Sequence, residues 1–445
     1  MEKFIVAGGG KLSGEITVSG AKNVALKALV ASCLTDEIVT IENIPLISDF
    51  FVMVDIVKEL GGSVSLNDHT ATVQIKQFKT NEVSLEKAAQ IRTSSMFLSP
   101  LLLRTGSAII PNPGGCRIGA RPIDRTIMGL EKMGADISYD SKDGYFHASI
   151  SKSQKRLHGT EYAFEKNTHT GTETLLIASV LAKGQSVLKN VAVEPEVDEL
   201  ISLLNAMGAH IKRVEPRTLV IDGVEKMHGT TFRVGPDRNE IVTFAVAAII
   251  TGGNVLIKEA NNASLEYFLD MLKKAGGGYG VVEEGIRFFD TGNLQATDVT
   301  TSIHPGFMTD WQGPWAVLMA KANGISIIHE TVFENRFGYV NGLKKMGAHI
   351  ELFNPEVKNP EKLYNFNISD VEKDAYHAAR ISGPTNLHNA AVYISDLRAG
   401  ATLVLGALAA VGKSVVFGVE YLDRGYEDFE KRLQGLGADI KRVSE

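Results

Sequence analysis

The chain has 445 residues, of which 44% are hydrophobic and 22% are charged, and its formal net charge is −6. This balance is typical of a globular protein of two or three domains, and it excludes a disordered or collagen-like chain and a strongly basic one. Two cysteines are too few for a disulfide framework, the N-terminal apolar run is too short for a signal peptide, and no apolar stretch reaches the ~18 residues of a membrane span. We therefore expect a cytoplasmic protein that binds neither nucleic acid nor a membrane.

One pattern recurs six times: an amphipathic helix-like run ends at a glycine, and alternating strand-like residues follow. The six glycines are Gly61, Gly134, Gly208, Gly276, Gly347 and Gly437. Glycine readily adopts the left-handed conformation just after a helix end. Apolar runs such as FAVAAIITGG lie between these copies, and because they lack a polar face we expect buried helices. The sequence thus predicts six α/β units in two groups of three, divided near Gly235.

The last two of these glycines are 90 residues apart, whereas the other spacings run from 68 to 74. The excess lies within FNPEVKNPEKLYNFNISDVEKD, a polar stretch with two prolines. We expect a surface insertion there that carries no chemistry.

The first apolar helix-like run opens with Lys22 and Asn23, within VSGAKNVALKAL. A lysine at a helix start is electrostatically unfavourable unless an anion compensates it, and helix N-termini near glycine bind anions. The pattern therefore indicates an anion site, with a solvated lysine as the alternative. Cys33, further along the same run, is predicted to be a small core residue.

Residues 111–125 read PNPGGCRIGARPIDR, and their richness in proline and glycine is typical of an exposed, mobile loop. Cys116 lies in this loop beside Arg117, with Arg121 and Arg125 nearby. Cationic neighbours favour the thiolate, so we expect a reactive thiol. The alternative is an incidental loop cysteine.

Two later transitions into apolar helix-like runs also carry charge. Asp310 follows a His-Pro-Gly turn and precedes WAVLMA, and Asp396 and Arg398 lead into the run of SDLRAGATLVL. An aspartate at such a place is alternatively a helix N-cap, whereas an arginine entering a helix needs an anionic partner. If the two groups of units face each other, Lys22, Asp310 and Arg398 converge on one cleft suited to phosphate and carboxylate groups.

Several longer stretches resemble the enolpyruvyl transferase family, and within it the members that act on UDP-N-acetylglucosamine in peptidoglycan precursor synthesis. The matching stretches include SGAKNVALKAL, GGCRIGARPID, PGFMTDWQ, ETVFENRF and SDLRAGATLVLGALAAVGKS, and the resemblance runs from residue 18 to the C-terminus. It implies an α/β fold, an inverted α/β prism of two domains, each with three βαβαββ repeats around buried helices. It also implies that the N-terminal strands complete the C-terminal domain, which gives 1–21 plus 236–445 as one domain and 22–235, with the Cys116 loop, as the other.

The resemblance also implies an active site for phosphoenolpyruvate and the sugar nucleotide. Lys22, Arg121 and Arg398 would hold the phosphate and carboxylate of phosphoenolpyruvate. Cys116 would protonate its methylene carbon, and Asp310 would take the proton from the sugar 3′-hydroxyl, so that Lys22, Cys116, Asp310 and Arg398 would form the catalytic set. The further positions implied for the sugar nucleotide are Asn23, Arg92, Arg121, Pro122, Ile123, Asp124, Arg125, Lys166, Asn167, Thr168, His169, Val332 and Arg336.

An addition and elimination between these substrates needs one acid and one base, and we expect no metal and no redox cofactor. Family members with this lid cysteine are generally susceptible to fosfomycin, so Cys116 is the expected target of that epoxide. Two alternatives stay open: an enolpyruvyl transferase for another acceptor, such as shikimate 3-phosphate, and a non-catalytic paralogue that binds the sugar nucleotide. The sequence leaves the oligomeric state open.

Overall fold

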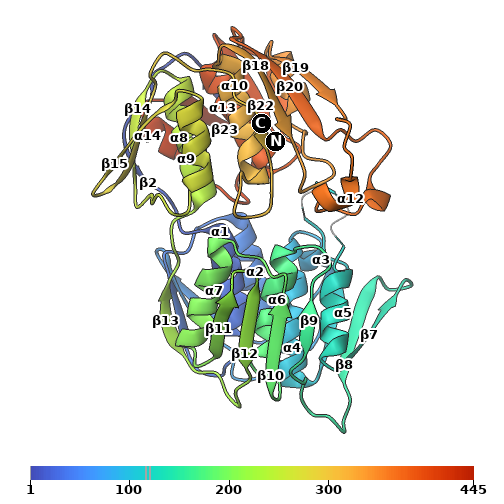
Figure 1. Cartoon of the computed structure of the whole chain (residues 1–445). Helices are drawn as coiled ribbons and strands as arrows, with labels where there is room; N and C mark the ends of the chain where they lie inside the picture. The colour runs from blue at the N-terminus through green and yellow to red at the C-terminus, as the bar shows by residue number, and fades with distance from the viewer. Residues whose placement is uncertain (1, 116–117, 120–121, 445) are drawn as a thin grey trace. The chain divides into compact units, whose positions relative to one another are not determined.

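Helices and strands alternate along the chain in the computed structural model, which describes residues 2–115, 118–119 and 122–444 (Figure 1). Their contacts group the chain into two units. Unit 1 takes residues 1–19, 116–121 and 236–445, and unit 2 takes residues 20–115 and 122–235. The domain limits implied by the resemblance, after residues 21 and 235, stay a prediction.

Unit 2 repeats one arrangement of helices and strands. Its helices are α1 (Lys22–Ser32), α2 (Ser48–Glu59), α3 (Leu85–Ala88), the 3₁₀ helix η1 (Arg92–Phe97), α4 (Leu98–Thr105), α5 (Asp124–Lys132), α6 (His169–Ser179) and α7 (Pro195–Ala206). Its strands are β3 (Val39–Glu42), β4 (Ser63–Asn67), β5 (Thr70–Gln74), β6 (Ser107–Pro111), β7 (Ala135–Asp140), β8 (Tyr145–Ile150), β9 (Glu161–Ala163), β10 (Gln185–Lys189), β11 (His210–Glu215), β12 (Thr218–Asp222) and β13 (Thr230–Arg233). The strands form sheets of order β13-β3-β5-β4, β11-β12-β10-β9 and β6-β8-β7.

Unit 1 repeats the same arrangement. Its helices are α8 (Arg238–Ile250), α9 (Glu266–Lys274), η2 (Thr309–Trp311), α10 (Gln312–Lys321), α11 (Val340–Lys345), α12 (Pro360–Leu363), η3 (Ile368–Asp370), α13 (Leu397–Ala409), η4 (Val419–Tyr421) and α14 (Phe429–Gly435). Its strands are β1 (Glu2–Ala7), β2 (Ser13–Thr17), β14 (Asn254–Lys258), β15 (Gly278–Val282), β16 (Gly285–Phe289), β17 (Val299–Thr300), β18 (Gly324–His329), β19 (His349–Phe353), β20 (Ala378–Gly383), β21 (Ala391–Tyr393), β22 (Lys413–Phe417) and β23 (Asp439–Ser444). The sheets have the orders β21-β22-β1-β23, β15-β16-β14-β2 and β17-β18-β20-β19.

All five four-stranded sheets share one pattern of strand directions. One outer strand runs parallel to its neighbour, as β13 does beside β3 and β2 beside β14, and the remaining pairs are antiparallel. The N-terminal segment takes part in unit 1, because β1 lies between β22 and β23 and β2 extends the sheet of β14. The α/β fold of repeated units expected from the sequence is confirmed.

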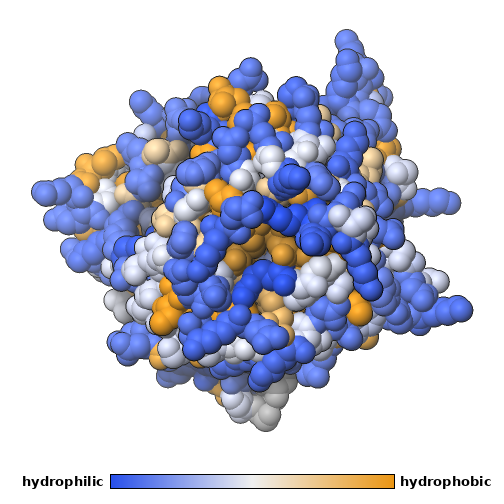
Figure 2. Space-filling model, turned by 90° about the horizontal axis from the view of Figure 1, so that it is seen from below, coloured by the Kyte–Doolittle hydropathy of each residue, from blue (hydrophilic) through white to orange (hydrophobic). Residues whose placement is uncertain are grey.

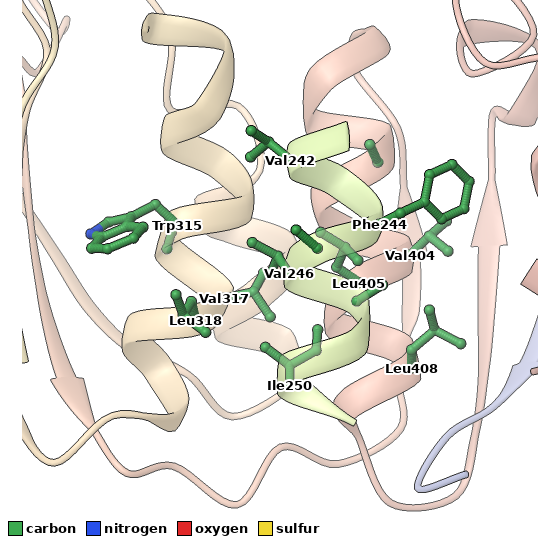
Figure 3. Close-up of a cluster of buried hydrophobic side chains, with 14 of the residues drawn as sticks. Val242, Phe244, Val246, Ile250, Trp315, Val317, Leu318, Val404, Leu405 and Leu408 are labelled. Atoms are coloured by element: carbon green, nitrogen blue, oxygen red, sulfur yellow. The ribbon is translucent and has the colours of Figure 1, made fainter. Parts of the chain in front are cut away.

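Each unit encloses its own hydrophobic core around central helices. In unit 1 these are α8, α10 and α13, whose apolar side chains face one another (Figure 3). All 13 residues of α8 are buried, which confirms that an apolar run without a polar face forms an interior helix. A fully buried leucine or phenylalanine contributes ~1.5–3 kcal/mol, so this packing holds the helix ends firmly in place. Two of these helix starts carry charged residues that the sequence singled out: Asp310 directly precedes α10, and Arg398 is in the first turn of α13.

The glycines that mark the repeats have the conformation that the sequence predicted. All six follow a helix of their repeat and have φ values between 75° and 103°, which is the left-handed region. At Gly61, for example, φ is 103° and the backbone turns from α2 toward β4. A side chain would strain the backbone at such a position.

The long spacing before the last repeat corresponds to an insertion between β19 and β20 that contains α12 and η3. The sequence predicted a polar surface segment, but the structure adds an aromatic anchor. Tyr364 and Phe366 are both 5% exposed and stack with ring centroids 4.8 Å apart. The backbone N–H of Asn365 donates to the carbonyl of Thr331 at 2.8 Å, so the insertion packs against the segment after β18.

The surface hydropathy and the character of the helices are those expected from the balanced composition. On the face shown in Figure 2, hydrophilic residues predominate and hydrophobic residues are scattered among them. Within the described part of the chain, no helix combines the length and apolar character that crossing a membrane requires.

Candidate active site

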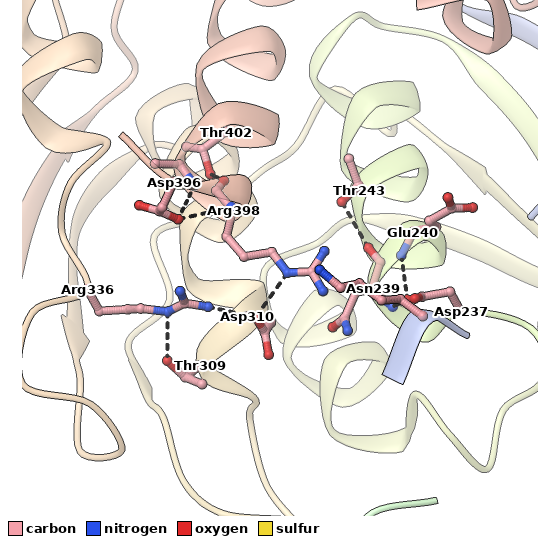
Figure 4. Close-up of polar contacts among 12 residues, drawn as sticks. Asp237, Asn239, Glu240, Thr243, Thr309, Asp310, Arg336, Asp396, Arg398 and Thr402 are labelled. Atoms are coloured by element: carbon pink, nitrogen blue, oxygen red, sulfur yellow. Dashed lines mark hydrogen bonds and ion pairs between the residues drawn. The ribbon is translucent and has the colours of Figure 1, made fainter. Parts of the chain in front are cut away.

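A carboxylate between two arginines lies at the start of α10 in unit 1. Asp310 is in η2, directly before α10. Its Oδ1 accepts hydrogen bonds from Arg336 Nη2 at 2.6 Å and from Arg398 Nε at 3.0 Å (Figure 4). The two arginine side chains are 5% and 13% exposed, whereas that of Asp310 is 23% exposed. The structure thus brings together three residues that the sequence singled out.

The two arginines control the protonation of Asp310. Burial by itself raises the pKa of a carboxyl group, but the charges of Arg398 and Arg336 outweigh it and hold the pKa of Asp310 well below its usual range. Asp310 is therefore a carboxylate at neutral pH, and a weak base while both arginines hold it. The alternative role as a helix N-cap is wrong, because the N-cap of α10 is Trp311 and that of η2 is Met308.

Arg398 enters α13 beside the residue that caps this helix. Asp396 Oδ1 accepts from the backbone N–H groups of Arg398 at 3.0 Å and Ala399 at 3.1 Å. The Arg398 side chain reaches Asp310 with Nε and donates from Nη1 to the hydroxyl of Tyr426 at 3.1 Å. The anionic partner that an arginine at a helix start requires is therefore Asp310, while Asp396 fulfils the capping role.

Val332 and Arg336 lie in the segment that follows β18. Glu330, a buried carboxylate at the beginning of this segment, accepts from the backbone N–H of Val332 and from the hydroxyl of Thr309. Arg336 Nε in turn donates to Thr309 Oγ1 at 3.2 Å. The motif ETVFENRF predicted Val332 and Arg336 but not Glu330, whose role depends on contacts with the distant residues Thr309 and Gln312.

In unit 2, Lys22 and Asn23 are the first two residues of α1. Lys22 Nζ lies 2.6 Å from Asp49 Oδ2, and these side chains are 13% and 6% exposed. Ala21, the N-cap of α1, makes no side-chain hydrogen bond to the helix start. The sequence predicted an anion beside Lys22, and the structure places Asp49 there. Sequence analysis missed Asp49 because nothing in its own segment links it to α1.

The predicted nucleotide-binding stretch leads into α6. Lys166 and Asn167 precede the helix, and the buried side chain of Asn167 donates to the carbonyl of Asn190 at 3.2 Å. Thr168 is the N-cap, and its hydroxyl oxygen accepts from the backbone N–H of Gly171 at 3.2 Å. These contacts fix the backbone at the helix start.

His169, the first residue of α6, belongs to a charge cluster around the buried Glu173; its own side chain is 26% exposed. Its Nε2 lies 3.1 Å from Glu173 Oε1, and Lys27 Nζ of α1 lies 3.1 Å from Glu173 Oε2. Burial favours the neutral form of Glu173, but His169 and Lys27 outweigh it and lower its pKa. Burial likewise lowers the pKa of His169, but Glu173 outweighs it, so the net shift is upward. The sequence named His169 and missed both partners.

Arg92 and residues 122–125 complete the predicted set in unit 2. Arg92 is the first residue of η1, and a Cβ at Gly115 would lie 3.3 Å from Arg92 Cβ. Pro122 and Ile123 lead into α5, whose first two residues are Asp124 and Arg125. The carbonyl of Arg125 accepts from the Tyr162 hydroxyl at 2.7 Å, which anchors the beginning of the helix.

Three named residues of the glycine-rich loop, Cys116, Arg117 and Arg121, lie outside the described residues. Ile118 and Gly119 between them group with unit 1. The backbone N–H of Asn335 donates to the carbonyl of Ile118 at 3.3 Å. Gly119 has a φ of 143°, which strains a residue with a side chain, and a Cβ there would lie 1.8 Å from a carboxylate oxygen of Glu334, which would have to move.

Cys33 is the core residue that the sequence predicted. It is completely buried in unit 2 and its thiol donates to the Leu29 carbonyl, with 3.3 Å between sulfur and oxygen. Burial raises the pKa of Cys33 to about 12, against a lowering by the charge of Arg104. The thiol is therefore protonated and unreactive in the folded chain.

Two units of repeated α/β structure, with charged side chains at the starts of their central helices, define the class of the enolpyruvyl transferase fold. Among solved structures, the enolpyruvyl transferase NikO from Streptomyces tendae matches with a TM-score of 0.85 at 24% identity, over 100% of this chain and 99% of that one. EPSP synthase from Acinetobacter baumannii matches with a TM-score of 0.73 at 17% identity, over 100% of both chains. These likenesses establish the fold.

Sequence comparison gives the family. The profile of EPSP synthase (3-phosphoshikimate 1-carboxyvinyltransferase) matches residues 6–433. The chain is 40% identical over 449 residues to the UDP-N-acetylglucosamine 1-carboxyvinyltransferase of Koribacter versatilis, covering 100% of this chain and 97% of the relative. It is also 40% identical over 445 residues to the protein of that name from Idiomarina loihiensis, covering 100% of both. The chain belongs to the EPSP synthase family of enolpyruvyl transferases.

Proposed function

We propose that the protein transfers the enolpyruvyl group of phosphoenolpyruvate to the 3′-hydroxyl of UDP-N-acetylglucosamine and releases phosphate, in the synthesis of peptidoglycan precursors in the cytoplasm. The observation that carries this proposal is 40% identity, over the full chain, to relatives named for that reaction. The likeness to EPSP synthase, at 17% identity, establishes the fold alone. It gives no comparable support to shikimate 3-phosphate as the acceptor.

Phosphoenolpyruvate is a multiply charged anion, so its site needs cations and helix starts. We propose Lys22, Arg121 and Arg398 for this role. Lys22 opens α1, whose N-cap offers no side-chain hydrogen bond, and Arg398 lies at the start of α13. Each of these two cations is paired with a carboxylate, Asp49 or Asp310, for which an incoming anion would compete.

This competition gives Asp310 its proposed role as the base. Two arginines lower the pKa of Asp310 and weaken it as a proton acceptor. When the substrate carboxylate or phosphate draws Arg398 away, one of the charges that lower this pKa is lost, and Asp310 becomes more basic. Binding of the first anion would thus prepare Asp310 to take the proton of the sugar 3′-hydroxyl.

The reaction then runs as an addition followed by an elimination. The Cys116 thiol donates a proton to carbon 3 of phosphoenolpyruvate, and the sugar 3′-oxygen forms a bond to carbon 2 as Asp310 takes the hydroxyl proton. In the elimination, carbon 3 returns a proton to the Cys116 thiolate and the double bond to carbon 2 forms again. The bond between carbon 2 and the phosphate oxygen breaks, and the leaving phosphate takes up the proton held by Asp310. Inorganic phosphate leaves, and the enolpyruvyl ether of the sugar nucleotide remains.

The remaining predicted residues are proposed to bind the sugar nucleotide. In unit 2 they are Asn23, Arg92, residues 122–125 and residues 166–169, and in unit 1 they are Val332 and Arg336. We also propose that 1–21 plus 236–445 and 22–235 are the two domains.

Release of phosphate from phosphoenolpyruvate tests the proposal directly. The assay is run with UDP-N-acetylglucosamine, with shikimate 3-phosphate and without acceptor. We expect release only with the sugar nucleotide, together with a product whose mass has grown by the enolpyruvyl group. Release only with shikimate 3-phosphate would assign the other acceptor. No release, with calorimetric binding of the sugar nucleotide retained, would identify a non-catalytic binding protein.

A further inference from the structure

Glu330 is a second carboxylate close to Asp310 and Arg336, and none of the roles proposed above involves it. It follows β18 and is fully buried, with 0% of its surface exposed. Each of its carboxylate oxygens accepts two hydrogen bonds. Oε1 accepts from the backbone N–H groups of Val332 at 2.7 Å and Phe333 at 3.0 Å. Oε2 accepts from the Thr309 hydroxyl at 2.8 Å and from Gln312 Nε2.

These donors belong to the two segments that carry Asp310, the proposed base, and Arg336, a proposed binding residue. Thr309 and Gln312 flank Asp310 in sequence, and Val332 and Phe333 precede Arg336. One buried side chain therefore ties the start of α10 to the segment after β18. Burial raises the pKa of Glu330, and the hydrogen bonds from Thr309, Val332 and Phe333 act against that rise without cancelling it. The geometry nevertheless presents four donors, which fit an acceptor with four lone pairs and no proton, an ionised carboxylate.

The carboxylate also sets the direction of the hydrogen bonds that follow. The Thr309 hydroxyl has a single proton, which it gives to Glu330. Its oxygen is then left as an acceptor for Arg336 Nε at 3.2 Å, and Arg336 Nη2 donates to Asp310 at 2.6 Å. An amide in place of the carboxylate would offer N–H groups to donors, and the hydroxyl would turn its proton elsewhere.

We propose that Glu330 is a positioning residue for the reaction: its ionised carboxylate orients Thr309, and through it Arg336, toward Asp310. Its effect on turnover rests on the proposed function, whereas its effect on Arg336 does not. Glu430 shows what a carboxylate with a purely structural partner looks like, because it is buried in the same unit and pairs directly with Arg442 at 2.9 Å.

The test exchanges donor and acceptor between two side chains. Glu330→Gln places an amide opposite the Gln312 amide, and Gln312→Glu places two carboxylates opposite each other. The double variant restores one acceptor and one donor between residues 312 and 330, and the new carboxylate can still accept from the Tyr339 hydroxyl, which donates to Gln312 Oε1 at 2.9 Å. The amide at position 330 still cannot accept the proton of Thr309, which donates to the same oxygen of Glu330 as Gln312 does. Each single variant should lose about 10–100-fold in kcat, and the double variant should stay as slow as Glu330→Gln, because it repairs the contact with residue 312 but not the one with Thr309.

A split between kinetic constants separates positioning from general destabilisation. Glu330→Gln should lower kcat and raise KM for the sugar nucleotide, because Arg336 and the Val332 backbone shift. KM for phosphoenolpyruvate should stay near its wild-type value, because Glu330 makes no hydrogen bond to Arg398. Glu430→Gln is the matched control: it should lower Tm but leave kcat unchanged.

A measurement on Arg336 decides the inference even if the proposed function fails. In protein labelled with ¹⁵N-arginine and without substrates, the Nε–H signal of Arg336, assigned through Arg336→Lys, reports its hydrogen bond to Thr309. The signal should move in Glu330→Gln and stay moved in the double variant, because neither restores an acceptor for the Thr309 proton. An unmoved signal in Glu330→Gln, or its return in the double variant, would overturn the inference. Absence of phosphate release by the wild type would overturn only the proposed function.

Discussion

Each unit holds a carboxylate between two cations, and the two clusters differ mainly in exposure. In unit 1, Asp310 forms ion pairs with Arg336 at 2.6 Å and with Arg398 at 3.0 Å. In unit 2, Glu173 forms ion pairs with Lys27 and with His169, both at 3.1 Å. The Asp310 side chain is 23% exposed, whereas that of Glu173 is 0% exposed. A substrate can reach the Asp310 carboxylate but not that of Glu173, although the His169 side chain beside Glu173 is itself 26% exposed. Exposure of the carboxylate, more than its pairing, therefore separates a reactive cluster from a structural one.

The enclosed cluster still bears on the proposed site. Lys27 is in α1 and Glu173 is in α6, so their ion pair joins two central helices of unit 2. The first residues of these helices, Lys22 and His169, are both proposed to bind substrate. A structural charge pair thus keeps two helix starts together, as Glu330 does with hydrogen bonds in unit 1.

The largest effect is expected for the exposed carboxylate. Asp310→Asn removes the proposed base and should lower turnover by ~10²–10⁴-fold. Phosphate release at saturating concentrations of both substrates measures it, and circular dichroism shows whether the variant is folded. A folded variant with near-normal turnover would remove Asp310 from the mechanism and abolish the chemical distinction between the clusters.

The two cysteines provide a second contrast, between a buried thiol and one with cationic neighbours in the sequence. Burial raises the pKa of Cys33 to about 12, whereas the cations near Cys116 in sequence favour its thiolate, so the rates of alkylation should differ by about a thousandfold or more. Intact-mass spectrometry after brief fosfomycin treatment, with the sugar nucleotide present, should find one adduct, at Cys116.

Cys116→Asp provides the control for this labelling. It should form no adduct yet remain active, because a carboxylic acid can also donate the proton. Labelling of Cys33, or an active wild-type enzyme without any adduct, would contradict the role proposed for Cys116.

Breaking the enclosed cluster should affect stability before chemistry. Glu173→Gln leaves Lys27 buried without its counter-charge, and loss of one partner of a buried pair costs ~3–5 kcal/mol. Urea unfolding measures the loss, and adding Lys27→Met to this variant should recover much of it. Glu161→Gln is the control, because its pair with Lys189 on the surface of the same unit is exposed and should matter little. Equal losses in the two glutamine variants would show that burial does not set the strength of the pair.

Local patterns allowed the sequence to predict the repeats and the central helices. A glycine after an amphipathic run, as at Gly61, depends only on neighbouring residues, and so does the apolar character of α8. The aromatic anchor in the insertion was not predicted, because Tyr364 and Phe366 lie in a largely polar stretch and pack on each other and on His377, which lies further along the chain.

The same limit applies to the predicted site: local patterns indicated some of its residues, but contacts between distant segments could not be predicted. An arginine at a helix start indicated that Arg398 needs an anion, but Asp310 lies 88 residues away in the sequence, and only the packing of α10 against α13 brings the two together. Asp49, Glu173 and Glu330 were missed for the same reason. Their roles arise from contacts between segments, and residue type alone does not distinguish them from other acids.

Arg398→Ala should have a smaller effect than loss of the base. A hydrogen bond to a charged group contributes ~1.5–3 kcal/mol, so KM for phosphoenolpyruvate should rise by about 10–150-fold while binding of the sugar nucleotide alone changes little. The variant also removes one of the charges that lower the pKa of Asp310, so the acid limb of the pH profile should move upward. Calorimetry with each substrate tests the assignment. Weakened binding of the sugar nucleotide, with use of phosphoenolpyruvate retained, would move Arg398 to the other substrate.

The smallest expected effect is a dependence of stability on pH that only the enclosed cluster has. Burial acts to lower the pKa of His169, but Glu173 outweighs it and raises the pKa in the folded chain. The folded state therefore binds this proton more tightly than the unfolded state, and its contribution to stability is fully present below the ordinary histidine value of ~6.5 and is lost as pH rises through the folded value. Between pH 6 and 9, the free energy of unfolding of the wild type should fall relative to His169→Gln.

The difference between wild type and Asp310→Asn should stay constant over this range, because the lowered pKa of Asp310 keeps it ionised and its arginines remain charged. Urea unfolding at pH 6, 7, 8 and 9 measures both differences, and parallel curves for the wild type and His169→Gln would show that His169 carries no charge in the folded cluster.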